Sequence, residues 1–217
     1  LSPQIIKTDQ AAINVILIML AIALGGGYAW WTGKRVAITD MPQMIAMYNG
    51  MGGGAAATIA AVELLKATSD ASLNSTSIAI ELGADVAILG ILGAIIGTVS
   101  FSGSIIAWAK LDGRLHRSKL LPAQHLVNAL IAIATVGFAL SIYFSSELTP
   151  IVVFFALALI LGIFITIPVG GADMPVIISL FNALTGLAVG FEGYVLGNAA
   201  MIIAGIVVGS AGSLLTH

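Results

Sequence analysis

The stretch DMPQMIAMYNGMGG, residues 40–53, decides the fold because it recurs as DMPVIISLFNALTG at residues 173–186. Asp, Met, Pro, an Ile at the sixth place, an aromatic residue at the ninth, Asn at the tenth and Gly at the fourteenth coincide. In each copy an apolar run follows the Asp–Met–Pro start, which is typical of the first turn of a helix. The chain therefore carries an internal repeat built around a helix.

The composition around this repeat excludes a water-soluble globular protein. Of the 217 residues, 59% are hydrophobic and only 8% are charged, whereas soluble domains carry about 25% charged residues. So few charges cannot cover the surface of a soluble protein of this size, so we expect a polytopic membrane protein. The net charge of −2 gives no basic surface for nucleic acid. A chain without Cys has no disulfides and no thiolate metal sites.

Seven apolar segments are long enough to cross the roughly 30 Å core of a bilayer as helices. None shows the alternating pattern of a barrel strand, so we predict an all-α polytopic membrane protein. The two motif copies begin an even number of spans apart, so the first three and last three spans form a parallel repeat. The predicted spans are residues 11–31, 44–65, 84–109, 126–144, 151–167, 175–191 and 194–215.

Basic residues in the loops predict the orientation. Six of the eight follow the first and third predicted spans, which places them on one side of the membrane. By the positive-inside rule that side is cytoplasmic, as are the turn at 168–173 and the C-terminal end of the last span. The chain begins at Leu1 without a cleavable signal pattern, so we expect a fragment of a longer subunit. The six basic residues are Lys34, Arg35, Lys110, Arg114, Arg117 and Lys119.

Each copy of the repeat carries one Asn, Asn49 or Asn182, nine residues after its Asp. At about 1.5 Å per residue, that Asn lies about 13.5 Å deeper, near the middle of the bilayer. Gly53 and Gly186 share the helix face of the Asn, and small residues four apart let two helix backbones approach closely. We therefore expect both amides to point into the bundle. There they either orient water or a proton carrier, or simply pack helices together.

The carboxylates have two interpretations each. Asp173 follows a flexible PVGGA stretch, and it either caps the next helix or is a protonatable group at the cytoplasmic mouth of a pathway. For Asp40, which lacks the two Gly, capping is favoured. Glu63, Asp85 and Glu192 lie near the outer ends of predicted spans. Solvation at the interface is their expected state, and an outer proton entrance is the alternative.

None of the three His, at positions 116, 125 and 217, lies in the middle of a predicted span. This matters because His is the side chain whose protonation changes near neutral pH. The chain alone therefore shows no proton carrier at mid-membrane, and we expect no metal site within the membrane.

Three stretches closely resemble the membrane domain of the beta subunit of proton-translocating NAD(P) transhydrogenase. They are GGADMPVIISLFNALTG at 170–186, TDMPQMIAMYNGMGG at 39–53 and GTVSFSGSIIAWAKLDG at 97–113, and the resemblance covers essentially all of the chain. It implies a Re/Si-specific complex of an inner membrane, dimeric when complete, that passes hydride from NADH to NADP while protons cross the membrane. It also implies two partners. One is an alpha-type subunit with transmembrane helices and an NAD-binding domain. The other is a soluble NADP-binding domain of the same subunit.

Under this resemblance residues 1–217 form one transmembrane proton-translocating domain, with further helices before it and the NADP-binding domain after it. No cofactor, no metal and no catalytic residue would belong to this domain, because NADP and NAD bind elsewhere in the complete complex. The implied pathway and coupling residues are Asp173 near the NADP domain, Asn182 and Asn49 at mid-membrane, and Ser104 near the channel. Many family members carry the His that serves as proton carrier at the position of Asn49. Here that His would come from the alpha-type subunit.

Two other functions stay open. The repeat is compatible with a secondary transporter or ion channel whose site lies between the two copies, which solute flux without nucleotide would reveal. The third possibility is a non-catalytic assembly subunit whose polar side chains only pack helices. Replacing Asn182 by Leu would then disturb assembly but not turnover.

Overall fold

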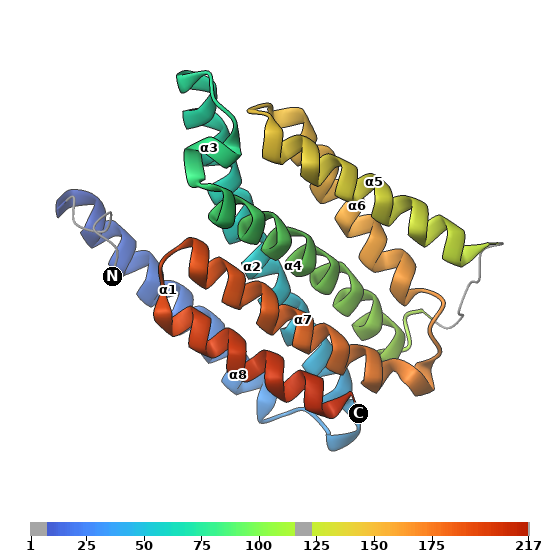
Figure 1. The fold of residues 1–217 in the computed structure, drawn as a ribbon. Helices are drawn as coiled ribbons and strands as arrows, with labels where there is room; N and C mark the ends of the chain where they lie inside the picture. Colours follow the sequence, from blue (N-terminus) through green and yellow to red (C-terminus); the bar gives the residue numbers. More distant parts are fainter. Residues whose placement is uncertain (1–7, 116–122, 217) are drawn as a thin grey trace. The chain divides into compact units, whose positions relative to one another are not determined.

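The computed structural model describes residues 8–115 and 123–216, and the regular elements within them are all helical (Figure 1). This confirms the predicted all-α class. Arg117, Lys119, His116 and His217, which entered the sequence predictions, lie outside the described residues. In chain order the elements are α1 Thr8–Gly33, η2 Ile38–Asp40, α2 Met41–Asn74, α3 Ile78–Leu82, α4 Ala84–Leu111, α5 Gln124–Phe144, α6 Leu148–Thr166, η3 Gly171–Asp173, α7 Met174–Val195 and α8 Ala199–Leu215.

The chain forms two compact units, Leu1–Met41 and Pro42–His217. The first contains α1, whose C-terminal end carries Trp30 and Trp31. The charged ends of Lys34 and Arg35 lie 4.1 Å and 4.4 Å from the centroids of these two rings, respectively. Aromatic rings with cations over them at a helix end are typical of a membrane interface. The second unit begins at Pro42 in the first turn of α2, and it contains the helices that follow and, apart from Asp40 and Met41, both copies of the motif.

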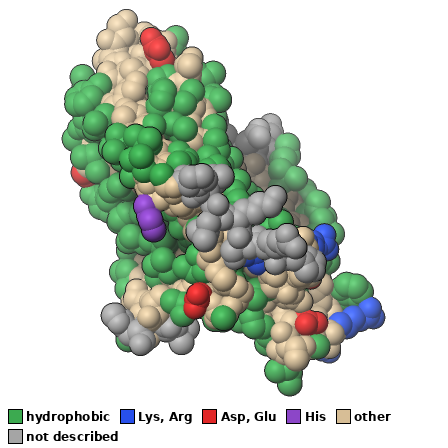
Figure 2. Space-filling view, turned by 90° about the vertical axis from the view of Figure 1, so that its right-hand side faces the viewer, with side chains coloured by type: hydrophobic (Ala, Val, Ile, Leu, Met, Phe, Trp, Pro, Cys, Tyr) green, Lys and Arg blue, Asp and Glu red, His purple; other side chains and the backbone are tan. Residues whose placement is uncertain are grey.

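Among the described residues, five helices are long and apolar enough to span a membrane, namely α1, α4, α5, α6 and α7. The face drawn in Figure 2 is accordingly dominated by hydrophobic side chains. Two of the seven predicted spans fall short of this measure. The helix α2 has 34 residues but is the least apolar of the long helices, and α8 has only 17 residues. Helices that pack on other helices through small residues need fewer apolar side chains than helices that face lipid.

The turn between α7 and α8 corrects the sequence analysis. The predicted boundary at residues 191–193 is wrong, because α7 continues to Val195 and α8 begins at Ala199. The chain turns at Gly197, whose φ of +62° suits a residue without a side chain. The side chain of Asn198 then accepts hydrogen bonds from the backbone N–H groups of Ala200 and Met201, at 3.1 Å and 3.3 Å. The Gly–Asn pair therefore ends one helix and caps the next.

The central helix of the second unit is α4, which packs closely against α2, α6 and α7. A Cβ added to Gly97 would lie 3.0 Å from the carbonyl oxygen of Gly53 on α2, Gly103 faces the ring of Phe181 on α7, and Gly162 of α6 abuts the backbone of α4. Successive contacts along α2 and along α7 meet α4 in reverse order. Both helices are thus antiparallel to α4 and run in the same direction, as the parallel repeat predicts (Figure 1).

The helices α7 and α8 pack backbone to backbone. A Cβ added to Gly186 would lie 2.7 Å from the Cα of Gly209 and 2.8 Å from the carbonyl oxygen of Gly205. The hydroxyl of Ser179 also donates a hydrogen bond to the carbonyl of Gly212 at 2.9 Å. The prediction that the glycine face of the second motif lets two helices approach closely is confirmed.

Candidate functional site

A cavity of about 430 Å³ lies where α2, α7 and α8 meet. Its polar lining comes from both copies of the motif, with Tyr48 and Asn49 from α2 and Asn182 and Thr185 from α7. Liquid water occupies about 30 Å³ per molecule, so this cavity has room for several waters. The remaining lining residues are Ile45, Gly52, Gly186, Val189, Ala204, Gly205 and Val208.

The repeat explains why the side chains of Asn49 and Asn182 line the same cavity. Each motif begins with a short 3-10 turn that ends at its Asp, and the long helix starts at the next residue. Asn49 and Asn182 then lie the same nine residues further on, about 13.5 Å along their helices. Because α2 and α7 run in the same direction, equal spacing brings the two Asn side chains to one depth and into one cavity.

Asn49 also ties α2 to α4. Its amide nitrogen donates a 2.9 Å hydrogen bond to the hydroxyl of Ser104, and both side chains are buried. Gly50 makes this approach possible, since a Cβ there would lie 3.2 Å from the Cβ of Ser104. The amide oxygen of Asn49 is buried without a hydrogen-bond partner. Buried polar atoms normally bond to protein or to water, so this oxygen is a position at which water can be held and oriented.

Three other side chains on α4 and α7 also carry buried oxygens without a hydrogen-bond partner. The hydroxyls of Ser100 and Thr185 and both carboxyl oxygens of Glu192 are buried without hydrogen bonds. Ser100 and Thr185 face neighbouring residues of α2. Their side chains lie 3.1 Å and 3.3 Å from a Cβ added at Gly53 and at Gly52, respectively. We call Asn49, Ser100, Thr185 and Glu192 the polar seam of α2, α4 and α7.

Asp173 lies exposed at the start of α7, and its side chain makes no capping hydrogen bond. Asp173 is the last residue of the 3-10 turn and stands at the N-cap position of α7, but its carboxylate accepts no backbone N–H there, so the capping interpretation is wrong for this side chain. Asp40, its counterpart in the first motif, is also exposed and accepts a 3.3 Å hydrogen bond from the hydroxyl of Thr39. Asp173 does not line the cavity that contains Asn182.

Lys110 is one of the basic residues that predict the orientation of the helices, and no site role is predicted for it. Its ammonium group donates hydrogen bonds to the carbonyls of Thr166, at 3.2 Å, of Val169, at 2.7 Å, and of Ile167. Thr166 is the last residue of α6, and Ile167 and Val169 follow it; backbone acceptors at a helix end lack helical partners. Lys110 therefore fixes the segment that leads into the Gly–Gly–Ala–Asp turn and α7.

The three carboxylates that the sequence predicts near the outer helix ends differ from one another. Glu63 forms an ion pair with Lys66 at 2.8 Å, and Asp85 accepts a 2.7 Å hydrogen bond from the hydroxyl of Tyr194. Glu192 is fully buried, so its expected solvation at the interface is wrong. The reason is the longer α7, which continues one turn beyond the predicted end and carries Glu192 against α4.

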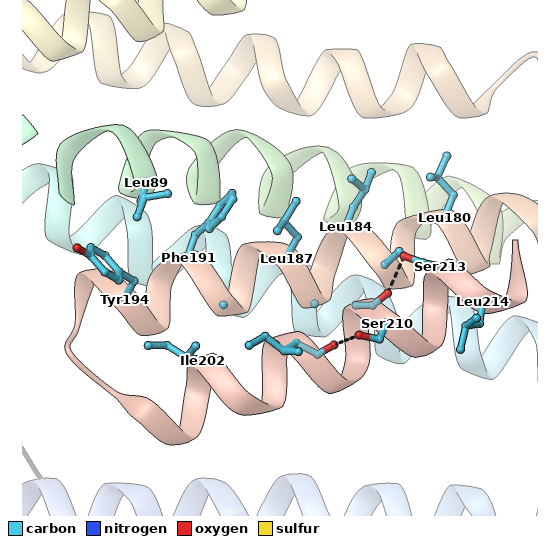
Figure 3. Close-up of a pocket in the computed structure, with 16 residues that line it drawn as sticks. Leu89, Leu180, Leu184, Leu187, Phe191, Tyr194, Ile202, Ser210, Ser213 and Leu214 are labelled. Carbon is cyan, nitrogen blue, oxygen red and sulfur yellow. Dashed lines mark hydrogen bonds between the residues drawn. The ribbon is translucent and has the colours of Figure 1, made fainter. Parts of the chain in front are cut away.

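A larger cavity of about 930 Å³ lies along α7 and α8 (Figure 3). Leu184, Leu187 and Phe191 are among its lining residues. The hydroxyls of Ser210 and Ser213 also line it, but each donates to a carbonyl of its own helix, at 2.6 Å and 2.8 Å. This surface is suited to apolar contact. The candidate site is therefore the smaller cavity, which both Asn49 and Asn182 line and which we call the amide cavity.

Within the described part of the chain, no three His, Asp or Glu side chains cluster so that they could hold a metal ion. The glycines Gly52 and Gly54 lie inside the helix α2.

Comparison with known proteins identifies similar chains. A family model described as NAD(P) transhydrogenase beta subunit matches residues 2–217. The NAD(P) transhydrogenase subunit beta of Rhodospirillum rubrum is 37% identical over 201 residues, and the subunit of the same name from a particular strain of that species gives the same values. Each match covers 92% of this chain but 42% of the relative, so the chain spans less than half the length of these relatives.

Proposed function

Because this chain belongs to the NAD(P) transhydrogenase beta subunit family, we propose that its helices form the proton-translocating membrane domain of NAD(P) transhydrogenase. In the complete Re/Si-specific complex, a dimer in an inner membrane, this domain couples proton movement to hydride transfer from NADH to NADP. NADP binds a soluble domain of the same subunit, on the cytoplasmic side where α8 ends. NAD binds an alpha-type subunit, which also contributes transmembrane helices.

The observation that carries this proposal is the single cavity lined by both Asn49 and Asn182. An amide has no proton to release near neutral pH, so these side chains hold water or a proton carrier rather than carry the proton themselves. The hydrogen bond from Asn49 to Ser104 fixes one amide, and its buried oxygen, which has no hydrogen-bond partner in the described part of the protein, is available to accept one from water. The carrier is a His of the alpha-type subunit, because this chain has Asn49 at the position where the resemblance implies that many family members carry the His.

Asp173 is the residue that couples the cavity to the nucleotide-binding domain. It is exposed and free of a capping role, so it can contact a soluble domain on the cytoplasmic side. It is joined to Asn182 by about two and a half turns of α7. A movement of the NADP domain that shifts the start of α7 would thereby change the cavity, which is a coupling between two states of one helix.

The test is Asn182→Leu in the complete complex, reconstituted in vesicles. Hydride transfer is followed by nucleotide absorbance, and proton uptake by a pH-sensitive dye. We expect both rates to fall together per assembled complex, because an apolar side chain cannot order water in the cavity. Asn128→Leu is the matched control, since Asn128 lies on α5 and does not line this cavity. Unchanged rates in Asn182→Leu would refute the proposal.

A second function is supported by the position of the same cavity between the two copies of the motif. A secondary transporter or channel would hold a solute there. It would show solute flux across vesicles without any nucleotide, and Asn182→Leu would abolish that flux. A subunit whose polar residues serve only assembly would instead yield less Asn182→Leu complex, with unchanged turnover per complex.

A further inference from the structure

Glu192 is a carboxyl group buried inside the helix bundle. Its side chain has 0% exposure, and neither carboxyl oxygen has a hydrogen-bond partner. The side chain fills the space left by Gly93 of α4, where any added Cβ would overlap the carboxyl group. The helix α4 begins at Ala84 on its outer side, and Gly93 follows nine residues later. Nine residues correspond to about 13.5 Å along the helix. Glu192 is therefore within the bundle rather than at its solvated edge.

The position of Glu192 continues the polar seam. On α7 it lies seven residues after Thr185, and this spacing places both on the same face of the helix. On α4, Gly93 is seven residues before Ser100 and eleven before Ser104, again on one face. The α7 face that carries Thr185 and the α4 face that carries Ser100 and Ser104 thus meet at Glu192, about 15 Å along α7 from Asn182.

The charged groups around Glu192 lie toward the outer ends of the helices. On α2, the carboxylate of Glu63 is partly exposed and paired with Lys66. From α4 and the end of α7, Asp85 and Tyr194 form an exposed hydrogen-bonded pair. Glu192 thus lies between exposed ionisable groups on the outer side and the amide cavity on the inner side.

We propose that Glu192 is the group that exchanges protons in the outer half of the proton route. An ionised carboxylate without partners is costly inside a membrane protein, and such residues commonly mark proton relays. In one step a carboxyl oxygen takes a proton from water on the outer side and becomes a neutral acid. In the next it gives that proton to water ordered by the polar seam, and the carboxylate returns. One proton is moved, and no other reactant is consumed.

The inference rests on the proposed function, so its test includes a wild-type reference. The complete complex is reconstituted as wild type, Glu192→Gln, Glu192→Asp and Glu81→Gln. Glu81 is an exposed outer carboxylate and serves as the matched control. Proton movement and hydride transfer are measured per assembled complex while the pH on the outer side is varied and the inner pH is fixed.

We expect Glu192→Gln to lower proton movement by about 10²-fold or more, which is the usual effect of removing a group that transfers a proton. It should also abolish the dependence on outer pH, whereas Glu192→Asp keeps that dependence and Glu81→Gln matches wild type. Wild-type rates and pH profile in Glu192→Gln would overturn the inference. Equal losses in the Gln and Asp variants, or failure of Glu192→Gln to assemble, would also overturn it, because the side chain would then serve packing. Hydride transfer without proton movement in the wild type would instead refute the proposed function.

Discussion

Ser104 of α4 accepts a 2.9 Å hydrogen bond from the side-chain amide of Asn49 on α2. This bond sets the orientation of an amide that lines the amide cavity. Interhelical hydrogen bonds in membrane proteins contribute only about 0.6 kcal/mol on average. The bond is thus better suited to orienting the amide than to holding the two helices together.

Ser104→Ala is accordingly expected to lower coupled proton movement and hydride transfer several-fold while the melting temperature of the complex changes little. Without the hydroxyl, the Asn49 amide can rotate and its oxygen no longer holds a fixed position. Ser102→Ala is the control on the same helix, because the hydroxyl of Ser102 donates to the carbonyl of Thr98 in its own helix at 3.1 Å. Equal activity in the Ser104 and Ser102 variants would contradict the orienting role.

Gly186→Ala is expected to destabilise the complex, because the added methyl would overlap the backbone of α8 at Gly209. Overpacking of this kind costs about 1–3 kcal/mol. Gly190→Ala, one turn further along the same helix, is the comparison, since a Cβ there would lie at an ordinary 4.0 Å from Gly205. Thermal unfolding of the purified complexes should separate the two variants, and equal stability would contradict the backbone contact between α7 and α8.

Lys110→Met is expected to loosen the end of α6 and the segment that leads to Asp173. Three carbonyls lose their ammonium donor, and hydrogen bonds to charged groups contribute about 1.5–3 kcal/mol each at most. Amide hydrogen exchange at residues 167–173 should become faster. Lys66→Met should leave exchange at 167–173 unchanged, because Lys66 is exposed and its ion pair with Glu63 contributes little. Unchanged exchange in Lys110→Met would contradict this account.

The sequence predicted the helices well because the signals are local. Apolar length, the Asp–Met–Pro starts and the Asn at equal spacing in both motifs are all visible without a structure, and they placed Asn49 and Asn182 at one depth. The end of α2, at Asn74 rather than residue 65, was one exception, and the helix end near Phe191 was another. There the Gly197–Asn198 pair outweighs Glu192 and Gly193 as a stop signal, and hydropathy alone does not distinguish the two.

The burial of Glu192 and the role of Lys110 could not be predicted in the same way. Each depends on which distant residue lies opposite, namely Gly93 for Glu192 and the end of α6 for Lys110. A single sequence gives the period of a helix but not its rotation against its neighbours. Charged residues near predicted helix ends are therefore assigned to water, although packing can bury one and leave another exposed.

Asp173→Asn tests whether the start of α7 senses the nucleotide domain of the proposed complex. The side chain is exposed and makes no capping bond, so the exchange of oxygen for nitrogen should leave assembly and melting temperature unchanged. If its charge contacts the NADP domain, proton movement and hydride transfer should both fall by about tenfold, the effect of losing about 1.4 kcal/mol of coupling. Asp40→Asn is the matched control, because Asp40 occupies the same place in the first motif and is exposed as well. Reconstituted vesicles in which both variants keep wild-type rates would exclude a coupling role for Asp173, and equal losses in both would point to a shared structural effect of the two turns.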